Sequence, residues 1–318
     1  MNIVFKVSDN VKDKMIKYYM DKKKEKTPPY AIFQAVEEDT VITLYESGKA
    51  MFQGTSADID ANIWIDMEKH LNNKTIDITS PSPKKDDKKN TPELQFNMST
   101  IGSDEVGTGD YFGPIIVTAS YVSKENIPFM LDLGVRDSKK ITDDKIKAIA
   151  PQIIKKIPYV TIILNNEKYN ENYSEDINMN KIKSLLHNRA IVTLLKKDNY
   201  DYQKIVIDQF VYPKKYYEHI SNSKEKAKNI TFTTKAEDKC LSVAASSVIS
   251  RYLFLQKIEE MKKETGMDIP KGAGLEVDKA AANIVKEFGL NKLKSLVKLN
   301  FKNTEKVLQI IKGDNSCN

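Results

Sequence analysis

Cysteine, arginine and tryptophan are scarce in this sequence of 318 residues. The two cysteines, Cys240 and Cys317, stand far apart and outside any C-x-x-C or Cys/His spacing, which excludes zinc fingers and a disulfide framework. We therefore expect a reducing compartment. Only three of the 50 basic residues are arginine, so lysine dominates the net charge of +6, and this lysine excess alone does not indicate a nucleic-acid partner.

Long apolar runs are also absent. No segment approaches the roughly 20 apolar residues that a membrane-spanning helix requires. The apolar stretch within the first ten residues is interrupted by Lys6 and Ser8, unlike the core of a signal peptide. We therefore expect a soluble, cytoplasmic protein that has no membrane partner, and no feature of the sequence indicates an obligatory protein partner.

The composition divides the chain into two domains. Residues 79–95 contain three prolines and seven charges and have almost nothing to bury, which is typical of a linker. Residues 1–78 carry 11 lysines against 13 acidic residues, whereas residues 96–318 carry a net charge of +7. We predict an N-terminal domain over 1–78, a linker over 79–95 and a larger, basic domain over 96–318.

The N-terminal domain shows strand and helix signals in a simple order. An alternating run is followed by an amphipathic helical pattern, then by three short β-type runs, and then by apolar residues at every fourth position. These strand signals lie at 2–7, 30–36, 40–45 and 50–53. Such a unit covers one face of its sheet with helices and leaves the other face free for a partner.

The large domain shows both strand and helix signals around a mixed sheet. Apolar runs at 99–103 and 114–122 flank a glycine-rich turn. Further strands are predicted at 159–164 and 204–207, and the helical spacing between them predicts a parallel pairing of these two with a right-handed crossover. Another helix is predicted over about 236–261. The residues by themselves indicate an α/β or α+β fold.

Acidic residues follow apolar runs at three separate places. Asp104 and Glu105 end the first strand of the large domain, and Asp208 follows another. Glu237 and Asp238 lie at the start of the last predicted helix. Each position alone has a structural explanation, since such residues also cap helices and complement the helix dipole. Together, four carboxylates can bind two divalent cations for displacement at phosphorus.

A glycine-rich turn follows the first acidic pair. Gly107, Gly109 and Gly113 permit unusual backbone angles and let N–H groups approach a phosphate or a sugar closely. A plain loop is the alternative interpretation, because a Gly-x-Gly turn is not specific.

These motifs together resemble bacterial ribonuclease HIII, a type 2 ribonuclease H. The resemblance is carried by residues 104–114, 136–140, 206–208 and 235–237. It extends over nearly the whole chain, since residues 29–34, 47–49 and 52–54 are similar to the family's N-terminal domain. It implies a ribonuclease H-like α/β domain with a mixed sheet and flanking helices, preceded by a small α+β domain like half of the TATA-box-binding protein.

The resemblance also implies the site residues. The metal ligands, which are the catalytic residues, would be Asp104, Glu105, Asp208 and Glu237, holding two Mg²⁺ or Mn²⁺ ions. Ribonuclease HII usually has aspartate at the fourth position, and Glu237 is preferred over its neighbour Asp238 because Lys-Ala precedes it. The implied substrate-binding residues are Gly107, Thr108 and Gly109, which would read the 2′-hydroxyl, and Ser138, Lys139 and Lys140, which would bind phosphates.

The implied activity is hydrolysis of the RNA strand of RNA–DNA hybrids, which leaves 5′-phosphate and 3′-hydroxyl ends. Two alternatives stay open. One is a ribonuclease HII-like incision at single ribonucleotides in duplex DNA, and the other is a non-catalytic nucleic-acid-binding protein with structural acidic residues.

Some residues are expected to have structural roles. The helical spacing predicts that His187 takes part in helix packing, that Cys240 is buried and that Trp64 belongs to the core. On the free face of the N-terminal sheet, the candidate hybrid contacts are Tyr30, Phe33, Lys49 and Gln53. Alternation along strands requires about half of these to point into the core.

Overall fold

A computed structural model describes residues 2–37, 39–54, 57–76, 97–135, 141–174 and 176–315. Contacts within the chain divide it into two compact units, Met1–Thr91 and Pro92–Asn318. The predicted linker, 79–95, lies outside the described residues, so the proposed domain boundaries stay a prediction. Among the described residues, no helix is long and apolar enough to cross a membrane.

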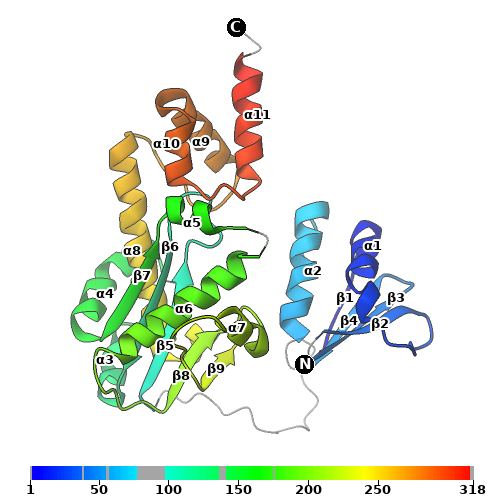
Figure 1. The fold of residues 1–318 in the computed structure, drawn as a ribbon, viewed down its shortest axis with the longest axis horizontal. Helices are drawn as coiled ribbons and strands as arrows, with labels where there is room; N and C mark the ends of the chain where they lie inside the picture. The colour runs from blue at the N-terminus through cyan, green and yellow to red at the C-terminus, as the bar shows by residue number, and fades with distance from the viewer. Residues whose placement is uncertain are drawn as a thin grey trace. The chain divides into compact units, whose positions relative to one another are not determined.

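The N-terminal unit is a four-stranded antiparallel sheet with both helices on one face (Figure 1). The predicted order of strand, helix, three strands and helix is confirmed. The strands pair in the order β1-β4-β3-β2. The elements are β1 (Asn2–Lys6), α1 (Asp9–Tyr18), η1 (Met20–Lys22), β2 (Ala31–Glu37), β3 (Thr40–Tyr45), β4 (Lys49–Gly54) and α2 (Ala57–Asn72).

Aromatic side chains fill the space between this sheet and its helices. The Trp64 indole N–H donates to the Tyr19 hydroxyl at 3.1 Å, which confirms Trp64 as a core residue. Phe33 is fully buried, so its assignment to the free face was wrong. Alternation along β2 points Phe33 and Ala35 toward the helices and leaves Gln34 on the other face.

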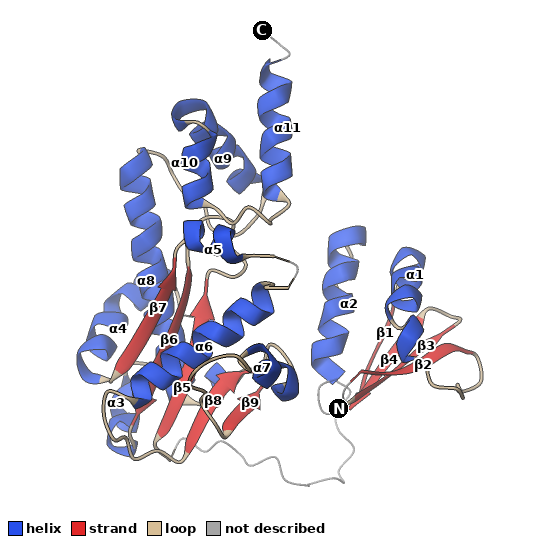
Figure 2. Cartoon of the chain, viewed as in Figure 1, coloured by secondary structure: helices blue, strands red, loops and turns tan. Residues whose placement is uncertain are grey.

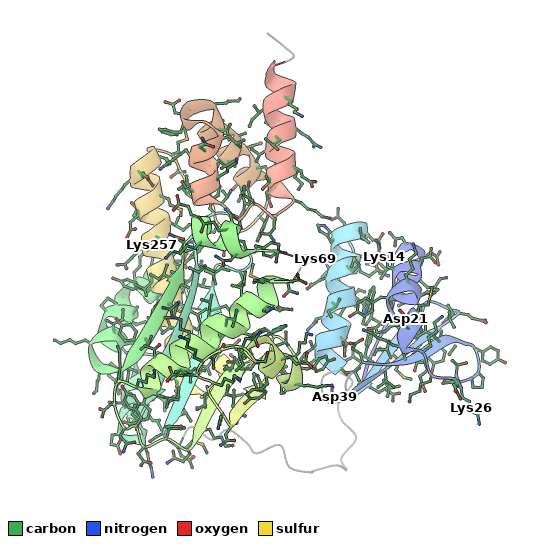
Figure 3. All side chains as sticks on the ribbon, in the orientation of Figure 1. Lys14, Asp21, Lys26, Asp39, Lys69 and Lys257 are labelled. Atoms are coloured by element: carbon green, nitrogen blue, oxygen red, sulfur yellow. The ribbon has the colours of Figure 1, made fainter. Side chains whose placement is uncertain are left out.

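The free face of the N-terminal sheet carries polar side chains. Lys49 and Gln53 are exposed on β4, as predicted. Tyr30 is 81% exposed and precedes β2 with a positive φ of 62°. Other charged residues, including Lys14 on α1 and Lys69 on α2, extend from the helices that cover the opposite face (Figure 3).

The C-terminal unit is a five-stranded mixed sheet between helices (Figure 2). Its strands pair in the order β7-β6-β5-β8-β9. The strands are β5 (Thr100–Val106), β6 (Ile115–Val122), β7 (Tyr159–Leu164), β8 (Lys204–Asp208) and β9 (Ile230–Thr233). The helices are η2 (Lys124–Asn126), α3 (Ile127–Asp132), α4 (Asp143–Lys156), α5 (Asn166–Asn172), α6 (Met179–Leu195), α7 (Pro213–His219), η4 (Ala236–Asp238), α8 (Leu241–Thr265), α9 (Leu275–Phe288), α10 (Leu290–Leu296) and α11 (Asn303–Asn315).

Helices α6 and α8 pack on opposite faces of β5. The Ser103 hydroxyl lies 2.8 Å from His187 Nδ1 of α6, whereas the carbonyl of the preceding Gly102 accepts a bond from Ser246 of α8. Below α6 lies an apolar cluster that includes Ile101, Val117 and Ile205. The central strand is therefore buried on both faces, and its acidic end emerges between two helices.

The predicted pairing of the strands at 159–164 and 204–207 was wrong. These strands, β7 and β8, run in the same direction, but β6 and β5 lie between them. Strand β8 pairs in parallel with β5 instead, and β5 and β6 form an antiparallel pair. Strand periodicity predicts the strands but not their neighbours in the sheet. The position of β5 and β6 between β7 and β8 was therefore not predicted.

The helix predicted over 236–261 begins later than expected. Residues 236–238 form the short 3₁₀ turn η4, and α8 starts only at Leu241. Lys235 adopts the left-handed conformation with φ 53°, and Cys240 is extended. Lys235 thus precedes the turn, and Lys239 and Cys240 separate the turn from the helix. Cys240 is buried, as predicted.

Small residues let α8 approach β5 very closely. A Cβ atom on Gly102 would lie 2.2 Å from the Val243 backbone nitrogen and 2.4 Å from the Ser242 carbonyl carbon. Both neighbours are backbone atoms, so no side-chain rotation could relieve the overlap. This contact fixes the position of β5, and with it that of Asp104, relative to α8.

We predict that Gly102→Ala destabilises the C-terminal unit by about 3 kcal/mol, because the added methyl group must separate α8 from β5. Gly109→Ala is the matched control, since a Cβ there would have no neighbour within 4 Å. Urea unfolding followed by circular dichroism measures the effect. Fluorescence of Trp64, the single tryptophan, reports the N-terminal unit independently. Equal stability of the two variants would contradict the close packing.

Candidate active site

Parallel pairing brings Asp104 and Asp208 to the same edge of the sheet. The register of β5 and β8 pairs Ser103 with Ile207, so Asp104 and Asp208 occupy the next position on each strand. Asp104 Oδ1 accepts a bond of 2.8 Å from the backbone N–H of Glu105. The carboxyl ends of neighbouring parallel strands thus place two carboxylates side by side.

A hydrogen bond from η4 attaches the third segment to this edge. The backbone N–H of Ala236 donates to Asp208 Oδ1 at 3.0 Å. Glu237, the next residue, is 3% exposed, whereas Asp238 is exposed. The turn therefore directs Glu237 inward beside Asp208 and leaves Asp238 toward solvent.

Glu105 points to the opposite face of the strand. Its Oε1 lies 2.5 Å from Lys183 Nζ, and its Oε2 lies 2.9 Å from His187 Nε2. Burial would raise the pKa of Glu105, but the Lys183 charge and the His187 hydrogen bond outweigh it and lower the pKa to about 2. Glu105 is thus ionised, and both of its oxygens contact α6.

Asp104 has the opposite electrostatic environment. Burial, reinforced by the charges of Glu105 and Asp208, raises its pKa to about 8. A hydrogen bond from Ser247 only partly offsets this effect. Because burial and the negative charges of Glu105 and Asp208 raise the pKa of Asp104, these carboxylates favour the binding of either a proton or a cation.

These oxygen donors fit a hard divalent cation in residue type and charge. As the side chains are placed, however, no three Asp, Glu, His or Cys side chains in the described parts of the chain converge into a group that could hold an ion. The alternation of β5 separates one adjacent pair, since Asp104 faces α8 while Glu105 faces α6. The structure thus places Asp104 and Asp208 at neighbouring strand positions, attaches the segment of Glu237 to Asp208 through Ala236, and turns Glu105 toward α6.

The glycine turn after β5 has one constrained end and one open end. Gly107 has φ 91°, and a Cβ there would lie 2.1 Å from the Pro114 carbonyl oxygen, so glycine is required. A Cβ on Gly109 would have no neighbour within 4 Å, and Thr108 between them is half-buried. Ser138, Lys139 and Lys140 lie outside the described residues.

A cavity of about 230 Å³ adjoins Glu105. Arg251 reaches into its lining from α8 and donates to Asp143 Oδ1 at 3.0 Å. The lining residues are Glu105, Val106, Ile141, Asp143, Ile146, Ser247 and Arg251. The carboxylate edge is therefore bordered by a cationic group.

Two residues of α6 that contact Glu105 were missed as parts of the site. His187 was predicted to take part in helix packing, and it is fully buried as that prediction requires. Helical spacing could not predict the hydrogen bond between His187 and Glu105 or the ion pair between Lys183 and Glu105. The only available signal was that Lys183 and His187 are four residues apart and so share one face of the helix.

Comparison with known proteins identifies the family. The Ribonuclease HII family profile matches residues 101–304, and a domain of unknown function (DUF3378) matches residues 2–76. A curated protein of Bacillus cereus, Ribonuclease HIII, is 41% identical over 316 residues, which cover 98% of this chain and 99% of the relative. The chain belongs to the ribonuclease HIII family.

Solved structures agree with this assignment. Bst-RNase HIII in complex with Mn²⁺ is 36% identical and matches with a TM-score of 0.69 over 98% of this chain and 100% of the other. The ribonuclease H2 of Pyrococcus horikoshii, at 23% identity and a TM-score of 0.56, shares the fold over 68% of this chain and 99% of its own length. The predicted resemblance and the ribonuclease H-like fold are confirmed, and the chain is a metal-dependent endoribonuclease of the ribonuclease H type.

The segment after the glycine turn is attached to the C-terminal helices. Lys298 is fully buried and its Nζ donates to the carbonyls of Asp110 and Gly113 at 2.8 and 2.5 Å. Backbone bonds join Tyr111 N–H to Gly272 O and Gly113 N–H to Leu296 O. The C-terminal helices thus fix the exit of the turn.

We predict a pH-dependent stability from Lys298. Burial lowers its pKa to about 7, although the Asp110 charge opposes this, from an ordinary value of 10.5 that unfolding restores. The unfolded chain therefore binds more protons than the folded one between these values, so this group makes stability rise with pH from about 7 to about 10.5 and adds no further change below about 7. Lys298→Met should reduce the slope by up to ~1.4 kcal/mol per pH unit.

Urea unfolding at about pH 7, 8 and 9 measures both slopes. The exposed Lys294→Met on α10 is the control and should keep the wild-type slope. The same slope in wild type and Lys298→Met would show that the buried lysine keeps an ordinary pKa.

Proposed function

We propose that this enzyme hydrolyses the RNA strand of RNA–DNA hybrids with two divalent cations, Mg²⁺ or Mn²⁺, held by Asp104, Glu105, Asp208 and Glu237. The observation that carries the proposal is that Asp104 and Asp208 occupy neighbouring positions on the paired strands β5 and β8, while the Ala236 N–H, one residue before Glu237, donates to Asp208. The products would be 5′-phosphate and 3′-hydroxyl ends. The Mn²⁺ complex of the related Bst-RNase HIII supports a divalent cation.

When bound, such cations supply an activated water for attack on phosphorus and stabilise the charge that develops on the leaving oxygen. The protein's own groups hold the carboxylates in place. The Ser250 hydroxyl donates to the Asp104 carbonyl at 3.3 Å, and the Ala236 N–H fixes Asp208. Besides burial, the charges of Glu105 and Asp208 both raise the pKa of Asp104, which supports Asp104 as the bridging ligand.

The glycine turn would distinguish RNA from DNA. The space that a side chain would occupy at Gly109 contains no protein atom within 4 Å of the Cβ position. A sugar can therefore approach the backbone closely there. The 2′-hydroxyl is the group that separates the two nucleic acids at a given position. Attachment of the following segment through Lys298 supports a rigid turn.

The N-terminal unit would enlarge the binding surface for the hybrid. Lys49 and Gln53 are exposed on the face of the sheet that the helices leave free. Residues 1–78 are slightly acidic in total, so hydrogen bonding should contribute more than bulk charge. A tethered second surface raises the effective concentration of the hybrid at the carboxylates without taking part in the chemistry.

The test compares charge-removing variants in a cleavage assay with an RNA–DNA hybrid and Mg²⁺ or Mn²⁺. Asp104→Asn and Glu237→Gln should each lower the cleavage rate by at least ~1,000-fold, because each removes a charged ligand. Hybrid binding should survive, since repulsion of phosphate is reduced. Asp238→Asn is the matched control and should cleave at a rate close to that of wild type.

Two outcomes would contradict the assignment. Near-normal cleavage by Asp104→Asn would exclude the carboxylate set, and greater damage from Asp238→Asn than from Glu237→Gln would show that the neighbour is the ligand. A parallel assay with a single ribonucleotide in duplex DNA tests the ribonuclease HII-like alternative. We expect slow cleavage of that substrate, and equal rates on both would favour the alternative.

A further inference from the structure

Glu105 is joined to a buried cation of the protein itself. Lys183 Nζ and Glu105 Oε1 are 2.5 Å apart, and the two side chains are only 11% and 12% exposed. His187 Nε2 occupies the other oxygen at 2.9 Å. Solvent and salt screen a pair at this depth much less than a surface pair.

An aromatic ring holds both partners of Glu105 in place. The Lys183 ammonium lies 3.9 Å from the centroid of the Phe210 ring, and the His187 ring stacks on Phe210 at 5.4 Å with an interplanar angle of 24°. Phe210 follows Asp208 by two residues, just beyond the end of β8. The position of Lys183 is therefore set by the same strand end that carries a carboxylate of the site.

We propose that Lys183 is a built-in counter-charge of the metal site, a positioning residue that holds Glu105 and sets the affinity of the site for divalent cations. Four carboxylates without a compensating charge would bind a divalent cation more tightly, because its attraction grows with the net negative charge. A fixed positive charge in contact with one of these carboxylates lowers that attraction. The inference rests on the proposed carboxylate set.

This arrangement has two separable consequences. The charge of Lys183 weakens cation binding, while its hydrogen bond orients the Glu105 side chain. A change that removes the charge and keeps a hydrogen-bond donor should therefore tighten cation binding. A purely structural role predicts unchanged binding for such a change, because the hydrogen bond that orients Glu105 is kept.

The experiment measures Mn²⁺ binding to the full chain by isothermal titration calorimetry, with the Mn²⁺-induced rise in melting temperature as a second measurement. Lys183→Gln removes the charge and retains a donor, and Lys183→Met removes both. We expect the Mn²⁺ dissociation constant of Lys183→Gln to fall by about tenfold. Without Mn²⁺, both variants should melt below wild type because Glu105 loses its buried partner.

Two controls separate charge from general disturbance. Lys183→Arg keeps the positive charge, so its dissociation constant should stay within about twofold of wild type. Lys181→Met removes a lysine of the same helix two residues earlier, on another side of α6, and should also leave Mn²⁺ binding unchanged. If Lys183→Met does not fold, Lys183→Gln alone still decides between tighter and weaker binding.

Unchanged or weaker Mn²⁺ binding by Lys183→Gln would overturn the inference. A different result would show that the proposed carboxylate ligands themselves are wrong. In that case wild type would not bind Mn²⁺, or Asp104→Asn would bind it as wild type does. Tighter binding by Lys183→Gln together with lost binding by Asp104→Asn supports both.

Discussion

Repulsion between buried carboxylates is the constraint on which the rest of the C-terminal unit depends. Asp104 and Asp208 occupy neighbouring positions on two adjacent parallel strands, Glu105 follows Asp104, and the segment of Glu237 is bonded to Asp208 through Ala236. Burial together with the charges of Glu105 and Asp208 raises the pKa of Asp104 to about 8, so a further negative charge is unfavourable there. Such a group of carboxylates lowers the stability of the fold, so we expect it only where function requires it. A site for divalent cations is such a function.

The surrounding fold compensates these charges in different ways on the two faces of β5. On the α8 face, small residues bring hydroxyl groups close, and Gly102 is required for that approach. On the α6 face, Lys183 and His187 contact Glu105 directly. The pKa values of neighbouring Asp104 and Glu105 are therefore moved in opposite directions by a single alternation of the strand.

Local patterns predicted most of the helices and strands. Asp104, Asp208 and Glu237 could be selected because each follows or starts an apolar element, and the family resemblance distinguished Glu237 from Asp238. Strand neighbours were beyond such patterns, so β7 and β8 were paired incorrectly. The roles of Lys183 and Lys298 were also beyond them, since helical spacing gives the face of a residue and not the group that it meets across the fold.

The most direct test of this account is the anomalous scattering of Mn²⁺ in crystals of the protein. We predict manganese peaks in contact with the Asp104 carboxylate and within reach of Asp208 and Glu237, with Asp238 outside the coordination sphere. Peaks confined to another acidic group such as Asp143, or no peak at the ends of β5 and β8, would contradict the account.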